Sequence, residues 1–546
     1  MKPSRAASLA WLLVAPTLLG CSLMGLDDFR QQRCVTDTDC LRAQSAFGNA
    51  ERCELYVCQQ GACVPRHGTE TCDGKDDDCN GFIDDGLAVT PHELTGTSSP
   101  DAVVAYAFGP TGAPTAYVVG GIRVGGERSM HGTVVSGTVA EPPVPLVYAS
   151  AAMAGPAAMA GPEQPCPANT LSAGVGASVC WFDDVALGAD QDQLVYATIN
   201  TAGCSKGQLR VGLALASDPF RVWLGSSPAG EAAQSNIELG VDVGDNSCSG
   251  NSVRDEEGAA AGARSPAVAV LEAAPSGAGA LVTWLAAASS SEPLASCGAS
   301  VDVPVQALGV TVPEEARGAE ELWLVGSNGG LPASLGQSSS LRPPAVVGVA
   351  ARGSSGQYLV AFPSKNEGVD GVALVFVTLK GEHLSIENGS FIEDDHPDFV
   401  ALANSRIDGK LALAWRSGCG PTSKLKLALL STAGNAFEGY PLSLGSGNII
   451  YKPQLLHASD GFATQGERGG WYITWSEALA RGVGRTRLVR LPDAPSTTVP
   501  EIFTVTSGAR GFPLLFPGED STANQGLITM TSAETLDVRV FPSWCQ

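Results

Sequence analysis

An acidic stretch, TCDGKDDDCNGFIDDG at positions 71–86, holds the residues whose types and spacing most clearly indicate chemistry. In a tight loop, alternate side chains converge on one point, and a glycine at the sixth position allows the turn that directs a backbone carbonyl inward. Carboxylate and carbonyl oxygens are the ligands that Ca²⁺ prefers. The stretch therefore predicts a calcium loop, with ligands from Asp76, Asp78, Asn80, the backbone of Phe82, and Asp84 or Asp85.

The loop departs from a helix-flanked calcium loop in its last ligand. Position twelve is Leu87 instead of glutamate, so Asp84 or Asp85 must complete the shell, and no helical pattern flanks the stretch. A shell completed in this way predicts an affinity in the range of extracellular calcium sites. Cys72 and Cys79 bracket the loop, and a disulfide between them would reduce its freedom before the metal binds. The alternative interpretation is a solvated acidic linker between two domains.

Residues 70–85 resemble a short metal-binding motif of exported bacterial proteins, in a family named after a surface-associated copper protein. The family's pattern is close to E-x-C-D-G-x-D-N-D-C-D-G-x-I-D-E, and this chain differs from it at Asp77, Asn80 and Asp85. The resemblance implies an exported, often cysteine-rich protein, and it implies no particular reaction. We do not expect copper to be the metal of this loop, because copper prefers imidazole or sulfur ligands. The nearest histidines, His67 and His92, lie outside the loop.

The first residues of the chain are typical of an export signal. Lys2 and Arg5 form a basic start, and the apolar run that follows is too short for a comfortable membrane span. The sequence then continues with Leu-Leu-Gly-Cys, ending at Cys21. This tetrapeptide resembles the lipobox of bacterial lipoproteins, which implies a signal peptide at 1–20 and lipid on Cys21.

The residues after Cys21 indicate where such a lipoprotein would be sorted. Ser22 follows the cysteine, which resembles the pattern of outer-membrane lipoproteins, and residues 21–33 would form the tether. We therefore expect a protein held at the outer membrane or cell surface by its lipid anchor. An ordinary secreted protein with a chance cysteine is the alternative.

The overall charge excludes some classes of partner. The 546-residue chain has a formal net charge of −23 and a sequence pI near 4.6. Binding to nucleic acid or to anionic lipid requires a positive field, so neither is expected. Beyond the export signal, no apolar run approaches the length of about twenty residues that a membrane helix needs. The sequence therefore predicts a protein tethered to a membrane and not embedded in it.

Cysteine usage divides the chain into two regions. Of the fifteen cysteines, seven lie between Cys34 and Cys79, and seven lie after residue 165. Residues 34–86 are too few to bury a sufficient apolar core, so we expect a small, irregular module held by disulfides. Zinc is the alternative, but the close pairs typical of structural zinc sites are missing. Each group is odd, so either one bridge joins the two regions or each region keeps a free thiol.

Residues 87–546 contain a repeat made of short, apolar, strand-like runs. A proline precedes an aromatic residue by eighteen positions in the ranges 266–284, 344–362 and 397–415, and by twenty-two positions in 453–475. A similar unit begins at Pro513, and a third strand-like run follows each pair. Repeats of this length built only of strands are typical of a β-propeller, whose blades each bury a face against the next.

The repeats also predict the number of blades. Two weaker copies near Pro100 and Cys180 bring the total to seven, although six or eight blades, or a pair of β-sandwiches, remain alternatives. The last unit offers only three strands. We expect a strand from Leu87–Leu94 to complete it, because closing the ring removes exposed sheet edges.

Few residues of the chain indicate catalysis. The recurrent Trp and Phe side chains could bind carbohydrate, but repetition at a fixed spacing favours packing between blades. Gly203–Gly207 matches a hydrolase pattern, yet it lies between two strand-like runs and predicts a hairpin turn instead of a nucleophile elbow. Glu393–Asp398, which contains His396, begins one blade. We expect a solvated loop there, with a ligand or ion site as the alternative.

These features predict an all-β protein whose leading function is binding. The hypothesis is a non-enzymatic, calcium-binding surface lipoprotein that presents a propeller to a protein or glycan. The alternative is an exported propeller enzyme acting on polysaccharide, since propellers host glycosidases and sequence spacing does not give the distance between carboxylates. A purely structural envelope component is the third possibility.

Overall fold

A computed structural model of the chain describes two units, Met1–Leu87 and Ala88–Gln546. The residues that it describes are 35, 55–59, 62–66, 92–95, 103–108 and 114–149, 184–223, 238–239, 262–312, 324–458, 470–478, 484–492, 502–509, 514–517, 525–530 and 535–541, the longer ranges with gaps. In the first unit, β1 (Leu55–Gln59) and β2 (Ala62–Arg66) form an antiparallel hairpin. The export signal, the tether and the acidic loop lie outside the described residues.

Strands build the described part of the second unit, in seven sheets of four to six strands each. The first two sheets consist of β4 (Val103–Phe108), β5 (Pro114–Val124), β6 (Glu127–Ser136), β7 (Val139–Ala140) and β8 (Val144–Pro145), and of β9 (Val147–Ala149), β10 (Asp184–Ala189), β11 (Gln193–Asn200), β12 (Gln208–Leu215), β13 (Asp218–Trp223) and β14 (Glu238–Leu239). The next two consist of β15 (Gly262–Val270), β16 (Ala280–Ala287), β17 (Val303–Thr311), β18 (Val325–Gly326) and β19 (Ala333–Ser338), and of β20 (Ala345–Arg352), β21 (Ser355–Asn366), β22 (Val369–Lys380), β23 (His383–Ile386) and β24 (Ser390–Glu393).

The remaining three sheets have four strands each. They consist of β25 (Asp398–Asn404), β26 (Leu411–Ser417), β27 (Lys424–Leu430) and β28 (Leu442–Ser446); of β29 (Gln454–Ala458), β30 (Gly470–Ala478), β31 (Gly484–Pro492) and β32 (Ile502–Ala509); and of β33 (Leu514–Pro517), β34 (Gln525–Met530), β35 (Thr535–Phe541) and β3 (His92–Thr95). Two short 3-10 turns, η5 (Ser327–Gly330) and η6 (Gly420–Thr422), lie in connections.

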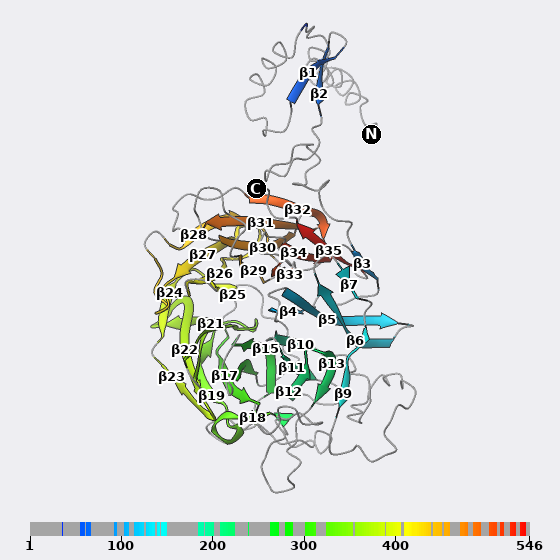
Figure 1. The fold of residues 1–546 in the computed structure, drawn as a ribbon. Helices are drawn as coiled ribbons and strands as arrows, with labels where there is room; N and C mark the ends of the chain where they lie inside the picture. Colours follow the sequence, from blue (N-terminus) through cyan, green and yellow to red (C-terminus); the bar gives the residue numbers. More distant parts are fainter. Residues whose placement is uncertain are drawn as a thin grey trace, which may run out of the picture. The chain divides into compact units, whose positions relative to one another are not determined.

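The sheets follow one another in a closed circuit within this unit (Figure 1). Their first strands, β4, β10, β15, β20, β25, β29 and β33, contact one another in that order, and β33 contacts β4. This arrangement is a β-propeller, so the prediction of an all-β propeller is confirmed. The described sheets number seven, which is the blade count that the repeats predict. We call the sheets blades 1 to 7 in the order of these first strands.

The last blade is completed by a strand from the start of the unit. In its strand order, β3-β35-β34-β33, the outer strand β3 pairs antiparallel with β35, from His92 opposite Val538 to Thr95 opposite Thr535. The closing strand is predicted at Leu87–Leu94; β3 overlaps the last three residues of that range and extends one residue beyond it. Pairing of the two ends gives β35 a neighbour that it would otherwise lack, and a capped edge does not recruit another chain.

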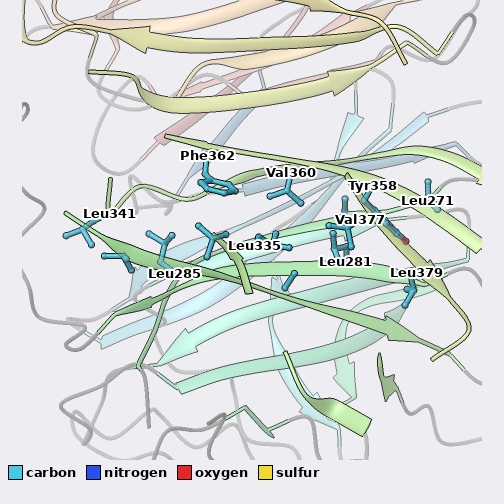
Figure 2. Packing of buried hydrophobic residues seen from close by; sticks show 14 residues of the cluster. Leu271, Leu281, Leu285, Leu335, Leu341, Tyr358, Val360, Phe362, Val377 and Leu379 are labelled. Atoms are coloured by element: carbon cyan, nitrogen blue, oxygen red, sulfur yellow. The ribbon is translucent and has the colours of Figure 1, made fainter. Parts of the chain in front are cut away.

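Consecutive blades hold together through apolar side chains that point from one sheet to the next. Figure 2 shows the cluster between blades 3 and 4, where Leu281 and Leu285 of β16 face Tyr358, Val360 and Phe362 of β21. Similar clusters join blades 1 to 2, 2 to 3, 4 to 5 and 5 to 6. Burial of both faces explains the near-continuous apolar runs in the sequence.

The recurrent aromatic residues are packing residues, as predicted from their fixed spacing. Trp284, Phe362, Trp415 and Trp475 are each 0–2% exposed and belong to these clusters between blades. A side chain buried to this extent cannot present its face to a sugar. The carbohydrate-binding interpretation of these four aromatic residues is therefore wrong.

The hydroxyl of Thr283 on β16 gives a first testable prediction. Its side chain is fully buried, and its Oγ1 has no hydrogen-bond partner among the described residues. An unsatisfied buried hydroxyl is destabilising, so Thr283→Val is expected to raise the free energy of unfolding by about 1 kcal/mol. Thermal and urea denaturation measure the change. The matched control is Thr133→Val, because the buried Thr133 hydroxyl donates to the Glu141 carbonyl and its loss is expected to destabilise the protein.

Candidate functional site

Polar side chains gather at one end of blades 4, 5 and 6. In an antiparallel sheet, the fourth strand ends where the first strand of the next blade begins, and the hairpin between the second and third strands lies at the same end. We call this end the connection face. It includes the connections 339–344, 394–397 and 447–453, which precede β20, β25 and β29. The charged residues Asp394, Asp395 and His396 lie in the second of these connections, and their ion-pair partners include residues of neighbouring strands.

A hydrogen-bonded network links these connections to each other. Asp398, the first residue of β25, lies opposite Arg416 of β26 and accepts from its Nη2 at 2.7 Å. The other carboxylate oxygen accepts from Ser340 Oγ, also at 2.7 Å. Arg416 Nη1 then donates to the Ile449 carbonyl at 3.0 Å. Burial and the neighbouring Arg342 lower the pKa of the Arg416 guanidinium, and Asp398 opposes that shift.

Phe399 lies between this network and a second guanidinium. Its ring centroid is 4.4 Å from Cζ of both Arg342 and Arg416, within cation–π distance. The φ of Phe399 is +52°, and the pairing of β25 with β26 shifts register between Asp398 and Ala401. A β-bulge of this kind redirects side chains. Positive φ is also costly for a non-glycine residue, so the bulge stores strain at the start of β25.

The carboxylate of Asp394 is buried beside Trp415 of blade 5. It accepts from Trp415 Nε1 and from Ser417 Oγ and forms an ion pair with Lys426. The Asp394 side chain is only 2% exposed. The expectation of a solvated loop at Glu393–Asp398 is therefore wrong for Asp394, because partners from two neighbouring strands replace its water.

Blade 6 repeats this arrangement with a different carboxylate. Trp475 Nε1 donates to Glu477 Oε1 at 2.9 Å, and Glu477 Oε2 accepts from Arg485 Nε at 2.7 Å. Arg487, opposite Trp475 in the sheet, lies 3.6 Å from the same oxygen. Lys426 lies opposite Trp415 in blade 5. A tryptophan, a carboxylate and a cross-strand cation thus occur together in both blades.

The exposed part of the connection face centres on His396. The imidazole is about half exposed; its Nδ1 lies 3.1 Å from Asp370 Oδ2, and its Nε2 lies 3.8 Å from Asp395 Oδ1. Asp370 also lies 3.6 Å from Lys365 on the long β21–β22 hairpin. In the described part of the chain, no group of three or more His, Cys, Asp or Glu side chains could hold a metal ion. His396 thus lies between the carboxylates of Asp370 and Asp395.

The other sequence-predicted positions lie outside the described residues, including the acidic loop ligands, the lipidation site Cys21 and the Cys72–Cys79 pair. Cys58 in β1 and Cys419 between β26 and β27 are each disulfide-bonded. The hydrolase-like Gly203–Gly207 joins β11 to β12, which pair antiparallel, as expected for a hairpin. Among the residues that are described, no helix is long and apolar enough to cross a membrane.

Sequence reasoning missed the cations of the connection face, namely Arg342, Arg416, Lys426, Lys452 and Arg487. The repeat itself contained a signal, because Lys452 directly precedes the repeat proline Pro453, as His396 precedes Pro397. Residues at that position lie two positions before the first strands of their blades. Aligning the polar residues of the repeats, in addition to the apolar ones, would have grouped them.

No protein-family profile and no curated protein matches the chain. A lectin from Burkholderia pseudomallei is 13% identical with a TM-score of 0.44, covering 82% of this chain and 97% of the lectin. A six-bladed, fucose-recognising lectin from Aleuria aurantia is 9% identical with a TM-score of 0.37, covering 76% and 99%. A Trypanosoma rangeli sialidase is 14% identical with a TM-score of 0.35, covering 66% of this chain and 54% of the sialidase. These similarities concern the propeller fold alone.

Proposed function

We propose that the chain is an exported lipoprotein, anchored at the outer membrane through lipid on Cys21, whose seven-bladed propeller binds a protein or glycan. Binding without catalysis is supported by the state of the buried carboxylates on the connection face. Asp394, Asp398 and Glu477 each accept hydrogen bonds and pair with a cation. Hydrolysis of a glycosidic bond requires two carboxylates that face the substrate. These three carboxylates instead bind side chains of the protein itself.

We also propose that the acidic loop binds Ca²⁺ and stiffens the segment before the propeller. The support is the spacing of its donors, from Asp76 through Asp78 and Asn80 to Asp84 and Asp85. An exported protein meets calcium at high concentration, so a site of modest affinity would be occupied there.

Calorimetric titration of Ca²⁺ into residues 22–546 tests the calcium part of the proposal. Wild-type protein is expected to show saturable heat, and Asp78→Ala is expected to abolish it because a central ligand is lost. Asp39→Ala, which lies outside the loop, serves as the matched control and should bind as wild type does. Equal heats for the wild type and Asp78→Ala would make the stretch an acidic linker.

The same preparations, assayed with calcium present, test binding against catalysis. Polysaccharides are expected to bind without release of new reducing ends. Release of reducing ends that scales with protein concentration would instead establish the enzymatic alternative.

For the full chain, Cys21→Ala is expected to move the protein from the membrane fraction to the soluble fraction. An unchanged membrane fraction would contradict the lipid anchor.

A further inference from the structure

We propose that β9 is a releasable strap, which covers the pairing edge of β13 in blade 2 and prevents a second copy of the chain from pairing with that edge. β9 lies beside β13 (Figure 1) and pairs with it from Val147 opposite Arg221 to Ala149 opposite Trp223. Among the seven described sheets, only that of blade 2 continues beyond its fourth strand. This role concerns association between copies of the chain and goes beyond the proposed binding function.

The pairing of β9 with β13 is short and parallel. It joins three residues of each strand, whereas the pairs of the described first, second and third strands are longer in most blades. The other described strand pairs of the seven sheets are antiparallel. Parallel pairing is slightly less stable per residue than antiparallel pairing. A short parallel ladder at the outside of a sheet is therefore among the first to open.

One end of the strap is fixed and provides a hinge. Leu146, directly before β9, is 1% exposed within the apolar cluster between blades 1 and 2. Its backbone N–H donates to the Met130 carbonyl at 2.9 Å, which ties it to β6. After β9, the chain continues through residues 150–183 before β10 begins. A connection of that length allows β9 to leave β13 while β10 stays in its sheet.

β13 is held in place by packing that does not involve β9. Phe220 and Val222 are buried in the apolar cluster between blades 1 and 2. The Phe220 ring fills the space beside Gly132 of β6, because a Cβ on that glycine would lie 2.0 Å from the ring carbon Cε1. Release of β9 therefore leaves β13 formed, with unpaired N–H and C=O groups along its outer edge.

A second copy of the chain fits this edge. Two copies of one edge strand, related by a two-fold axis, pair antiparallel and join their sheets. Two exposed apolar side chains belong to the segments beside the strap. Val144 lies three positions before β9 and is 43% exposed, and Leu215 lies opposite Asp218 of β13 and is 40% exposed. A second copy would cover apolar surface that one copy alone leaves in water.

A variant that cannot form the strap tests the proposal. Val147→Pro, Tyr148→Pro and Ala149→Pro together remove the N–H donors of β9, so the ladder with β13 is lost. Light scattering after size exclusion measures the mass of the full chain in detergent as protein concentration rises. The strap variant is expected to double in mass, while the wild type stays monomeric. The matched control combines Glu238→Pro with Leu239→Pro in β14, the other short outer strand of blade 2, and should stay monomeric.

Hydrogen exchange of the wild-type chain gives a second readout that does not depend on the folding of a variant. If β9 opens alone, the amides of residues 221–223 that pair with it exchange through this local event. They are therefore expected to exchange faster than the amides of β11 in the middle of the same sheet. In the strap variant, the same amides should gain protection as protein concentration rises, because the second copy replaces β9.

Four results would overturn the proposal. A strap variant that stays monomeric at every concentration would show that β9 does not guard the edge of β13. A lower unfolding temperature without a dimer would make β9 a structural brace of blade 2. Large particles of mixed size would contradict two-fold pairing of β13 with a second copy. Equal exchange rates for the β11 amides and for residues 221–223 of the wild type would show that β9 opens only when the whole blade does.

Discussion

Replacing Arg416 by methionine is expected to lower the free energy of unfolding by about 3 kcal/mol. The Arg416 side chain is 9% exposed, and its partner Asp398 is 15% exposed. Removing one member of a buried pair leaves the other charge without compensation, which costs about 3–5 kcal/mol. Because Arg416 also bonds the Ile449 carbonyl, the variant loses a link between blades 5 and 6. Chemical denaturation of wild type and variant measures the difference.

A double-mutant cycle distinguishes the ion pair from general loss of packing. Combining Arg416→Met with Asp398→Asn removes both charges, so the double variant is expected to be more stable than the sum of the single losses predicts. Lys365→Met provides an exposed comparison, because the pair of Lys365 with Asp370 lies near the surface and is expected to contribute less than about 1 kcal/mol. Additive losses in the cycle would contradict the role assigned to the pair.

Deleting the closing strand is expected to destabilise the protein about as much as Arg416→Met does. It is also expected to lower the solubility of the protein. Removal of residues 21–95 takes away β3 and leaves β35 as an unpaired edge of blade 7. Loss of two to four ladder hydrogen bonds, at about 1 kcal/mol each, predicts destabilisation by about 2–4 kcal/mol. The exposed edge is also a template for pairing with another chain. Thermal unfolding and light scattering measure the two consequences.

Removal of residues 21–87 is the matched control, because it deletes the first unit and keeps β3. This shorter deletion is expected to retain the unfolding midpoint of the propeller and to scatter light as the wild type does. If both deletions unfold at the same temperature and scatter light equally, β3 does not close the ring. If only the longer deletion lowers the unfolding temperature and raises light scattering, β3 is the strand that completes blade 7.

The sequence determined the architecture of this protein because a propeller blade is a local unit. Each repeat contains the strands of one sheet, and neighbouring strands pair with short connections, so the spacing from Pro397 to Trp415 reports one strand pair directly. The burial of that tryptophan followed from repetition at a fixed distance. Ring closure also followed, because a unit with three strands needs a fourth.

The partners of the polar groups were decided only by the tertiary structure. Asp394 in a connection meets Trp415 and Lys426 on two different strands, whereas Glu477 lies on the same strand as Trp475. Equivalent tryptophans thus obtain their carboxylates from unrelated positions in the sequence. A hydrogen bond depends on distances within a few tenths of an ångström, and periodicity does not specify them.

The cations of the connection face show the same limit. Arg342 and Lys452 lie in two different connections and Arg416 lies on β26, with more than thirty positions between neighbours in the sequence, and each alone is an ordinary polar residue. The circuit of first strands brings those connections together at one end of the blades. Strand periodicity and repeats therefore determined the fold and its core, while the ring's closure in space decided which charges face one another.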